Sequence, residues 1–342
     1  VKRHLVKQFI QHGIATKQTD TSGQLYIEGL ETVDISEKTL SEQLVTCIHQ
    51  SKRAGYALEK GEFLKDYKYS VIFTCNDFSS TLKKAKEIIP LENTYENDYL
   101  YTSFVKPVAY SMDGYYFLKF NLAYAAIHPL TQEEFLTKYP FLVVFHEKGE
   151  LIEFRFDVLK RVFLSDKKEP TIYSNLIAEM SDYFKEHFEC DLIPLNLDFM
   201  VNVCKRDENV KLIAQSMKLP NGGNAQLDVG NNQEYILPFI GELRSLLNDN
   251  QAELEKVPDF REALEQFMFE MEEMSDYPWI ELLWENEIKT RSNRVKFVFN
   301  YMNKSYCLIQ YYYSNVLIGM ERMNYVIEYI VNHRNDDTTQ NE

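Results

Sequence analysis

Residues 141–156 read FLVVFHEKGELIEFRF, and this stretch decides the fold class. Two strand-like runs, at 141–146 and 150–156, flank the charged, glycine-containing segment 147–149, a pattern typical of a β-hairpin. A second hairpin signal precedes it, because the Asp113-Gly114 pair separates two further runs rich in aromatic residues. Consecutive hairpins pair their strands antiparallel, so the middle of the chain predicts an antiparallel sheet.

The strand predicted at 150–156 alternates in polarity. Successive side chains of a strand point to opposite faces. One face carries the apolar residues Ile152, Phe154 and Phe156, and the other carries the charged residues Glu153, Arg155 and Asp157. The alternation predicts a sheet with one buried face and one face in contact with water.

Helices are expected in the part of the chain that follows these hairpins. In the segments 171–188 and 320–332, apolar residues recur at the spacing of an amphipathic helix. The second of these segments follows three predicted strands, and its apolar stripe consists of Met320, Met323, Val326, Ile327 and Ile330. We expect this stripe to dock on those strands. The fold class is therefore α+β, with antiparallel, hairpin-rich sheets and packed helices.

The length of the chain predicts two domains, because a domain typically holds about 150 residues and this chain has 342. The charged run 166–169, followed by Pro170, is typical of a linker. We expect an N-terminal α+β domain at 1–165 and a C-terminal α+β domain at 166–342, which ends in the sheet-docked helix.

The composition indicates a cytoplasmic protein. The five cysteines are scattered, as is typical of reduced thiols. The basic start lacks the apolar core of a signal peptide, although a first residue other than Met is compatible with a missing upstream segment. No apolar run reaches the ~18 residues of a membrane span, so no membrane partner is expected. The abundance of Lys, Tyr, Asn and Ile suggests a bacterial or phage protein.

Signature motifs of several enzyme classes are absent. The sequence contains no G-x-G-x-x-G, G-x-x-x-x-G-K-[ST], H-E-x-x-H or G-x-S-x-G motif, which disfavours dinucleotide-binding enzymes, P-loop NTPases, zincins and α/β-hydrolases. His187 and Cys190 have no further ligands at zinc spacing, so structural roles are expected for both. No cofactor and no metal site is predicted, and a non-catalytic protein is favoured over an enzyme.

One enzymatic alternative stays open on the strand at 150–156. Glu153-Phe154-Arg155 resembles the E-x-K element of metal-dependent nucleases, in which an acid holds Mg²⁺ and a cation stabilises the phosphate. Asp157 lies on the same face and completes the set of candidate catalytic residues. The competing interpretation is an ion pair on a solvated sheet face.

A second alternative is binding of single-stranded nucleic acid. Arg291, Arg294 and Lys296 lie close in sequence to the tyrosines at 311–313, and cations beside aromatic rings are typical of such binding surfaces. A net charge of −15 opposes this interpretation, because an acidic protein repels phosphate backbones. Nucleic acid therefore remains an open partner.

The acidic charge is concentrated at 251–290, which holds twelve acidic and three basic residues. Within it, the helix predicted at 258–274 carries Phe260, Leu264, Phe267, Met268 and Met271 on one side. Its other side is acidic and supplies the candidate partner-binding residues Glu262, Glu265, Glu270, Glu272 and Glu273. An acidic surface attracts a basic protein. We expect a non-catalytic binding or assembly subunit of a bacterial or phage multi-protein system, with antiviral host defence or counter-defence as its setting; a homo-oligomer is compatible with this role.

Overall fold

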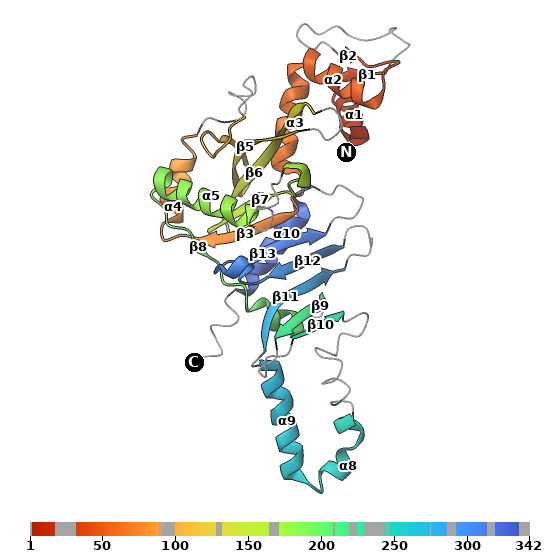
Figure 1. Ribbon diagram of the computed structural model, residues 1–342, viewed down its shortest axis with the longest axis vertical. Helices are drawn as coiled ribbons and strands as arrows, with labels where there is room; N and C mark the ends of the chain where they lie inside the picture. The colour runs from red at the N-terminus through yellow and green to blue at the C-terminus, as the bar shows by residue number, and fades with distance from the viewer. Residues whose placement is uncertain are drawn as a thin grey trace.

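The computed structural model describes residues 2–17, 32–88, 90, 100–127, 132–163, 171–207, 209–218, 224–228, 243, 246–273, 275–285, 292–312 and 319–334. The molecule is elongated, with the first two helices at one end, a sheet in the middle and a helical projection at the other end (Figure 1).

The N-terminal part of the chain forms a small helical unit. It consists of α1 (Lys2–Gln11), α2 (Leu40–Gln50) and α3 (Lys52–Leu64), with the short parallel pair β1 (Ala15–Thr16) and β2 (Val33–Asp34). These elements share a small apolar core of their own. The far end of α3 belongs to the central core, so α3 connects the unit to the sheet.

Eleven strands of the described residues form one sheet in which every strand pair is antiparallel. From edge to edge these are β10 (Asn224–Asp228), β9 (Val210–Lys218), β11 (Asp276–Trp284), β12 (Asn293–Val298), β13 (Leu308–Tyr312), β3 (Tyr69–Thr74), β7 (Leu151–Phe156), β6 (Glu134–His146), β5 (Tyr115–Ile127) and β4 (Val108–Met112), with β8 (Ile193–Pro194) paired to the end of β3. The α+β class, the antiparallel pairing and both hairpins of the middle segment are confirmed.

Helices cover both faces of the sheet. The further helices of the described residues are α4 (Phe78–Ala85), α5 (Ile172–Phe188), α6 (Met200–Arg206), α8 (Gln251–Leu254), α9 (Pro258–Glu273) and α10 (Glu321–His333), with 3-10 turns η2 (Arg161–Phe163) and η4 (Tyr301–Asn303). α4 and α5 pack against one face through a phenylalanine-rich core. α3, α6 and α10 pack against the opposite face. None of the described helices is long and apolar enough to cross a membrane.

The docking predicted for the last helix is confirmed. In α10, Met323, Val326, Ile327 and Ile330 are at most 1% exposed. They share one core with Val295 and Phe297 of β12 and with Ile309 and Tyr311 of β13.

The prediction of a water-facing side for β7 is wrong. All six residues of the strand are buried, including the charged Glu153 and Arg155 at 0% exposure. Their face is covered by α10, whose Asn324 accepts a hydrogen bond from Arg155. The sequence pattern separates a polar face from an apolar face, but it does not reveal that a distant helix covers the polar one.

The sheet itself continues across the predicted domain boundary. β13 pairs with β3 through Ile309 and Gln310, and β8 pairs with the end of the same strand. The linker residues 166–169 and Pro170 lie outside the described residues. The division into 1–165 and 166–342 stays a prediction.

Candidate functional site

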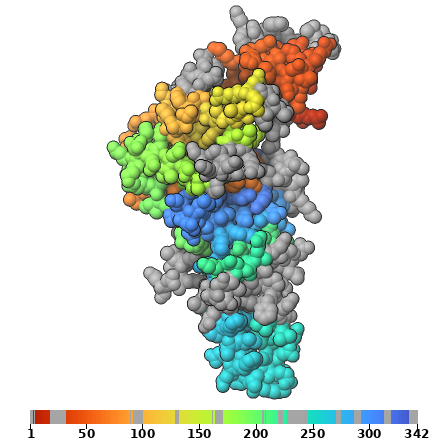
Figure 2. All heavy atoms as spheres, viewed as in Figure 1, coloured from red at the N-terminus to blue at the C-terminus, as the bar shows by residue number. Residues whose placement is uncertain are grey.

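The helices α8 and α9 form an arm that projects from the β9–β11 end of the sheet (Figure 1). α9 has 16 residues, which corresponds to about 24 Å at the rise of an α-helix. The space-filling view shows the arm as the extreme end of the molecule (Figure 2). Pro258 at the start of α9 favours this helix, because proline lacks only an amide hydrogen that the first turn leaves unbonded.

Only part of the apolar side of α9 is buried. Met268 is 4% exposed and belongs to a small core with Leu247 and with Met217 of β9. Leu264 and Leu254 are partly buried against the same core. This core therefore secures the arm through Leu264 and Met268, while the other described side chains of α9 are exposed or partly exposed.

Three phenylalanines of the arm are exposed to solvent. The exposed fractions of Phe260, Phe267 and Phe269 are 61%, 47% and 57%. At about 100° per residue, Phe260 and Phe267 lie on one line of the helix, while Phe269 lies on the opposite side. The apolar side expected from the sequence exists, but most of Phe260 and about half of Phe267 have no neighbour to bury them.

Phe269 lies on the acidic side of the helix. Glu262 and Glu265 are within about 40° of it on the helical projection, and both are exposed. Glu265 accepts a hydrogen bond from Arg261 at 2.8 Å, one turn earlier. α9 as a whole carries six acidic residues and one basic residue. The predicted binding residues Glu270, Glu272 and Glu273 fall in α9 as well, but their side chains lie outside the described residues.

The nuclease candidates Glu153 and Arg155 are brought together in the interior. Oε2 of Glu153 accepts a hydrogen bond from Nε of Arg155 at 2.8 Å, and Nη2 of Arg155 lies 2.6 Å from the same oxygen. His146 Nε2 is 2.8 Å from that oxygen too, and Arg155 Nη2 donates to Asn324 at 2.7 Å. Burial alone would raise the pKa of Glu153, but the charge of Arg155 and the hydrogen bonds from His146 and Arg155 outweigh it, so the pKa is lowered.

The third candidate, Asp157, belongs to a different contact. Its carboxylate pairs with Lys65 and accepts a hydrogen bond from the backbone amide of Lys68 at 3.0 Å. Because Glu153 and Arg155 are 0% exposed, a nucleic acid has no direct access to them. The geometry therefore gives the nuclease alternative no support.

His146 and Asn324 are members of this buried network that sequence reasoning missed. His146 pairs with Leu151 across the hairpin, which places its side chain diagonal to Glu153 on one face. The register of the hairpin could therefore have identified His146 as a neighbour of Glu153. Asn324 has no corresponding signal, since it lies 169 residues from its partner Arg155.

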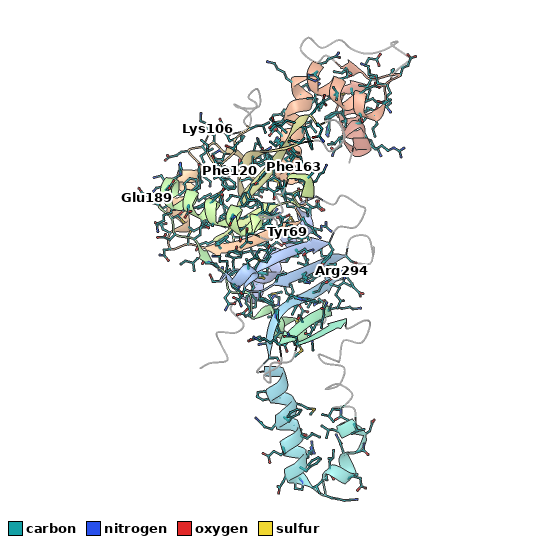
Figure 3. The ribbon with its side chains drawn as sticks, viewed as in Figure 1. Tyr69, Lys106, Phe120, Phe163, Glu189 and Arg294 are labelled. Carbon is teal, nitrogen blue, oxygen red and sulfur yellow. The ribbon has the colours of Figure 1, made fainter. Side chains whose placement is uncertain are left out.

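The candidate nucleic-acid residues contact neighbouring side chains. Arg294, labelled in Figure 3, pairs with Glu281 of β11 and lies 4.9 Å from the ring centroid of Tyr312. Lys296 lies 3.5 Å from the ring centroid of Trp279. Arg291 lies outside the described residues. These contacts show a cross-strand ion pair and two cation–π pairs, and they give the nucleic-acid alternative no additional support.

The two residues considered as zinc ligands, His187 and Cys190, do not form a metal site. His187 stacks on Tyr183 with ring centroids 4.0 Å apart, and Cys190 is buried. Among the described residues, no three His, Cys, Asp or Glu side chains are grouped so that they could hold a metal ion. All five cysteines are free thiols.

Comparison with protein-family models and with curated proteins finds no match to this chain.

Proposed function

We propose that the chain is a non-catalytic binding or assembly subunit of a multi-protein system, bacterial or phage as its composition suggests, and that the α8–α9 arm binds its protein partner. The observation that carries the proposal is the exposure of Phe260, Phe267 and Phe269, at 61%, 47% and 57%, on a projecting acidic helix. Exposed aromatic side chains that cluster on one element are typical of interaction surfaces.

The chemistry of the arm defines the kind of partner. Phe269 stands on the acidic side near Glu262 and Glu265, so it suits a partner with an apolar pocket surrounded by Lys or Arg. Burial of one phenylalanine side chain contributes about 1.5–3 kcal/mol to binding. The surrounding carboxylates accelerate the encounter with a basic surface more than they strengthen the final complex.

A different protein is a better partner for the arm than a second copy of this chain. The chain carries a net charge of −15, and α9 itself has six acidic residues against one basic residue. Two acidic arms repel each other when they approach. The proposal therefore commits to a basic partner protein.

The test starts with an arm variant that combines Phe269→Ser, Glu262→Lys and Glu265→Lys. All three side chains are exposed, so the fold is expected to tolerate the changes. Proteins that copurify with the wild-type chain are identified, and their binding to purified wild type and variant is then measured by biolayer interferometry. We expect a basic partner whose association rate with the variant falls at least about tenfold.

A matched control carries similar substitutions at the start of β6: Leu136→Ser, Glu133→Lys and Glu134→Lys. Leu136 is 63% exposed, and both glutamates are exposed as well. This control should bind like the wild type. Association with the wild type should also slow between 0.1 M and 1 M salt, as the Debye length falls from about 10 Å to about 3 Å. Equal loss of binding in both variants, or full retention in the arm variant, would refute the proposal.

A further inference from the structure

A pocket lies beside the buried His146–Glu153–Arg155 network. Its volume is about 260 Å³, and its walls come from the β4–β5 turn, the β6–β7 turn and α10. Of the network, it is His146 that lines the pocket. The side chain of His146 is only 6% exposed, so a ligand reaches it only by entering the pocket.

The hydrogen bonding of His146 determines which of its atoms is available. Nε2 is 2.8 Å from the carboxylate of Glu153, whose negative charge is maintained by Arg155. Burial lowers the pKa of His146 and keeps the imidazole neutral, and the hydrogen bond to the carboxylate places its proton on Nε2. Nδ1 is then a hydrogen-bond acceptor, and among the described residues it has no partner. A ligand in the pocket that donates a hydrogen bond to Nδ1 would satisfy this acceptor.

The rim of the pocket carries more negative than positive charge. Asp113, Glu328 and Lys148 line the pocket, and all three side chains are exposed. The hydroxyl of Tyr115 donates to Oε1 of Glu328 at 3.3 Å, so the ring of Tyr115 forms a wall next to this carboxylate. That ring meets the imidazole of His146 edge to face, with centroids 5.4 Å apart.

Another part of the wall is apolar and fixed in position. Ile327 and Val331 of α10 supply aliphatic surface. The β6–β7 turn is held against this helix, because Arg334 Nη1 donates to the carbonyl oxygen of Gly149 at 2.9 Å. A Cβ atom on Gly149 would lie 2.7 Å from Cγ2 of Val331, so the turn and the helix are in close contact. The pocket is preformed, which lowers the entropy cost of binding.

We propose that this pocket binds a small molecule with a protonated primary amine on a short alkyl chain. The ammonium group donates one hydrogen bond to Nδ1 of His146 and another to the carboxylate of Glu328. The alkyl chain lies against Ile327 and Val331. A volume of about 260 Å³ accommodates a free amine of this size, and comparison with a lysine analogue distinguishes it from a lysine side chain of a partner. An anion would meet the two carboxylates of the rim.

The test uses butylammonium as the probe, with butan-1-ol and butyrate as the neutral and anionic analogues of similar length. Binding is followed by NMR of ¹⁵N-labelled histidine, in which the signal of His146 is assigned by its loss in His146→Gln. For five non-hydrogen atoms, saturation with a dissociation constant on the order of 1 mM is expected. Butan-1-ol should bind about tenfold more weakly, and butyrate should leave the signal unchanged.

A pair of variants on α10 isolates the role of the carboxylate. Glu328→Gln should weaken butylammonium about tenfold, while Glu321→Gln, an exposed glutamate of the same helix outside the pocket, should bind it normally. Both positions are exposed, so folding is not at risk. Equal effects of these two substitutions would overturn the proposal.

Three further outcomes overturn it. The first is that butylammonium at up to about 20 mM causes no saturable shift of the His146 signal. The second is that butyrate binds as tightly as butylammonium. The third is that Nα-acetyl-lysine amide binds more tightly than butylammonium, which would assign the pocket to a partner's lysine. The arm variant should bind butylammonium like the wild type. The pocket and the arm are thus tested separately.

Discussion

Replacing Glu153 by Gln removes the negative charge from the centre of the buried network while nearly preserving the shape of the side chain. Arg155 keeps its charge at 0% exposure. In the native protein it directs two nitrogens to Oε2 of Glu153, at 2.8 Å and 2.6 Å. After the change, the guanidinium retains the amide oxygen of the new side chain and that of Asn324, but no charge balances it.

The size of the effect follows from this burial. Removing one partner of a buried ion pair destabilises a protein by about 3–5 kcal/mol, because the remaining charge stays desolvated without compensation. A pair on a solvated sheet face would contribute about 0–1 kcal/mol. The two arrangements therefore predict clearly different results for the same substitution, and the structure predicts the larger one.

The free energy of unfolding is measured by urea titration with tryptophan fluorescence, since Trp279 and Trp284 both lie in β11 of the same sheet. Glu265→Gln is the control: it breaks the exposed pair with Arg261 on α9 and should cost less than about 0.5 kcal/mol. Loss of less than about 1 kcal/mol in Glu153→Gln would show that Arg155 reaches water or another anion, and the reasoning would fail.

Three further predictions concern the same face of the sheet. Ile327→Asp should prevent stable folding, because it places an unpaired charge in a core position that is 1% exposed. The control, Tyr325→Asp, lies on the exposed side of the same helix and should melt close to the wild-type temperature in a thermal scan. Gly149→Ala should destabilise the protein by about 1–3 kcal/mol in urea titrations, since its Cβ would lie 2.7 Å from Val331. Adding Val331→Ala to the same chain should restore part of that stability. If no stability is restored, the strain comes from another contact. Burial lowers the pKa of His146 below its ordinary 6.5, so the unfolded chain binds the proton at a higher pH than the folded one. The stability that comes from neutral His146 is thus fully present above pH ~6.5 and is lost as the pH falls below it. Unfolding titrations between pH 7.5 and pH 5 should show this loss of stability in the wild type. A loss of the same size in His146→Gln would contradict its attribution to His146.

Much of the fold was predictable because local patterns determine local structure. The Asp113-Gly114 pair and the segment 147–149 end up in the two hairpin turns of the middle segment, between β4 and β5 and between β6 and β7. The stripe around Ile327 predicted a docked helix, and that helix is α10. Turn residues restrict the backbone directly, and apolar periodicity selects the face that leaves water, so neither needs information from elsewhere in the chain.

What surrounds each face was decided only in three dimensions. The alternation of Glu153 and Arg155 with apolar residues is the same whether water or α10 covers the polar side, and Asn324 reaches Arg155 from 169 residues away. In α9 the opposite occurs, because a stripe typical of core packing leaves Phe260 61% exposed. A pattern of polar and apolar residues records which side chains share a face. Whether a face is buried depends on which distant element occupies the space beside it, and the chain decides that only when its long-range contacts form.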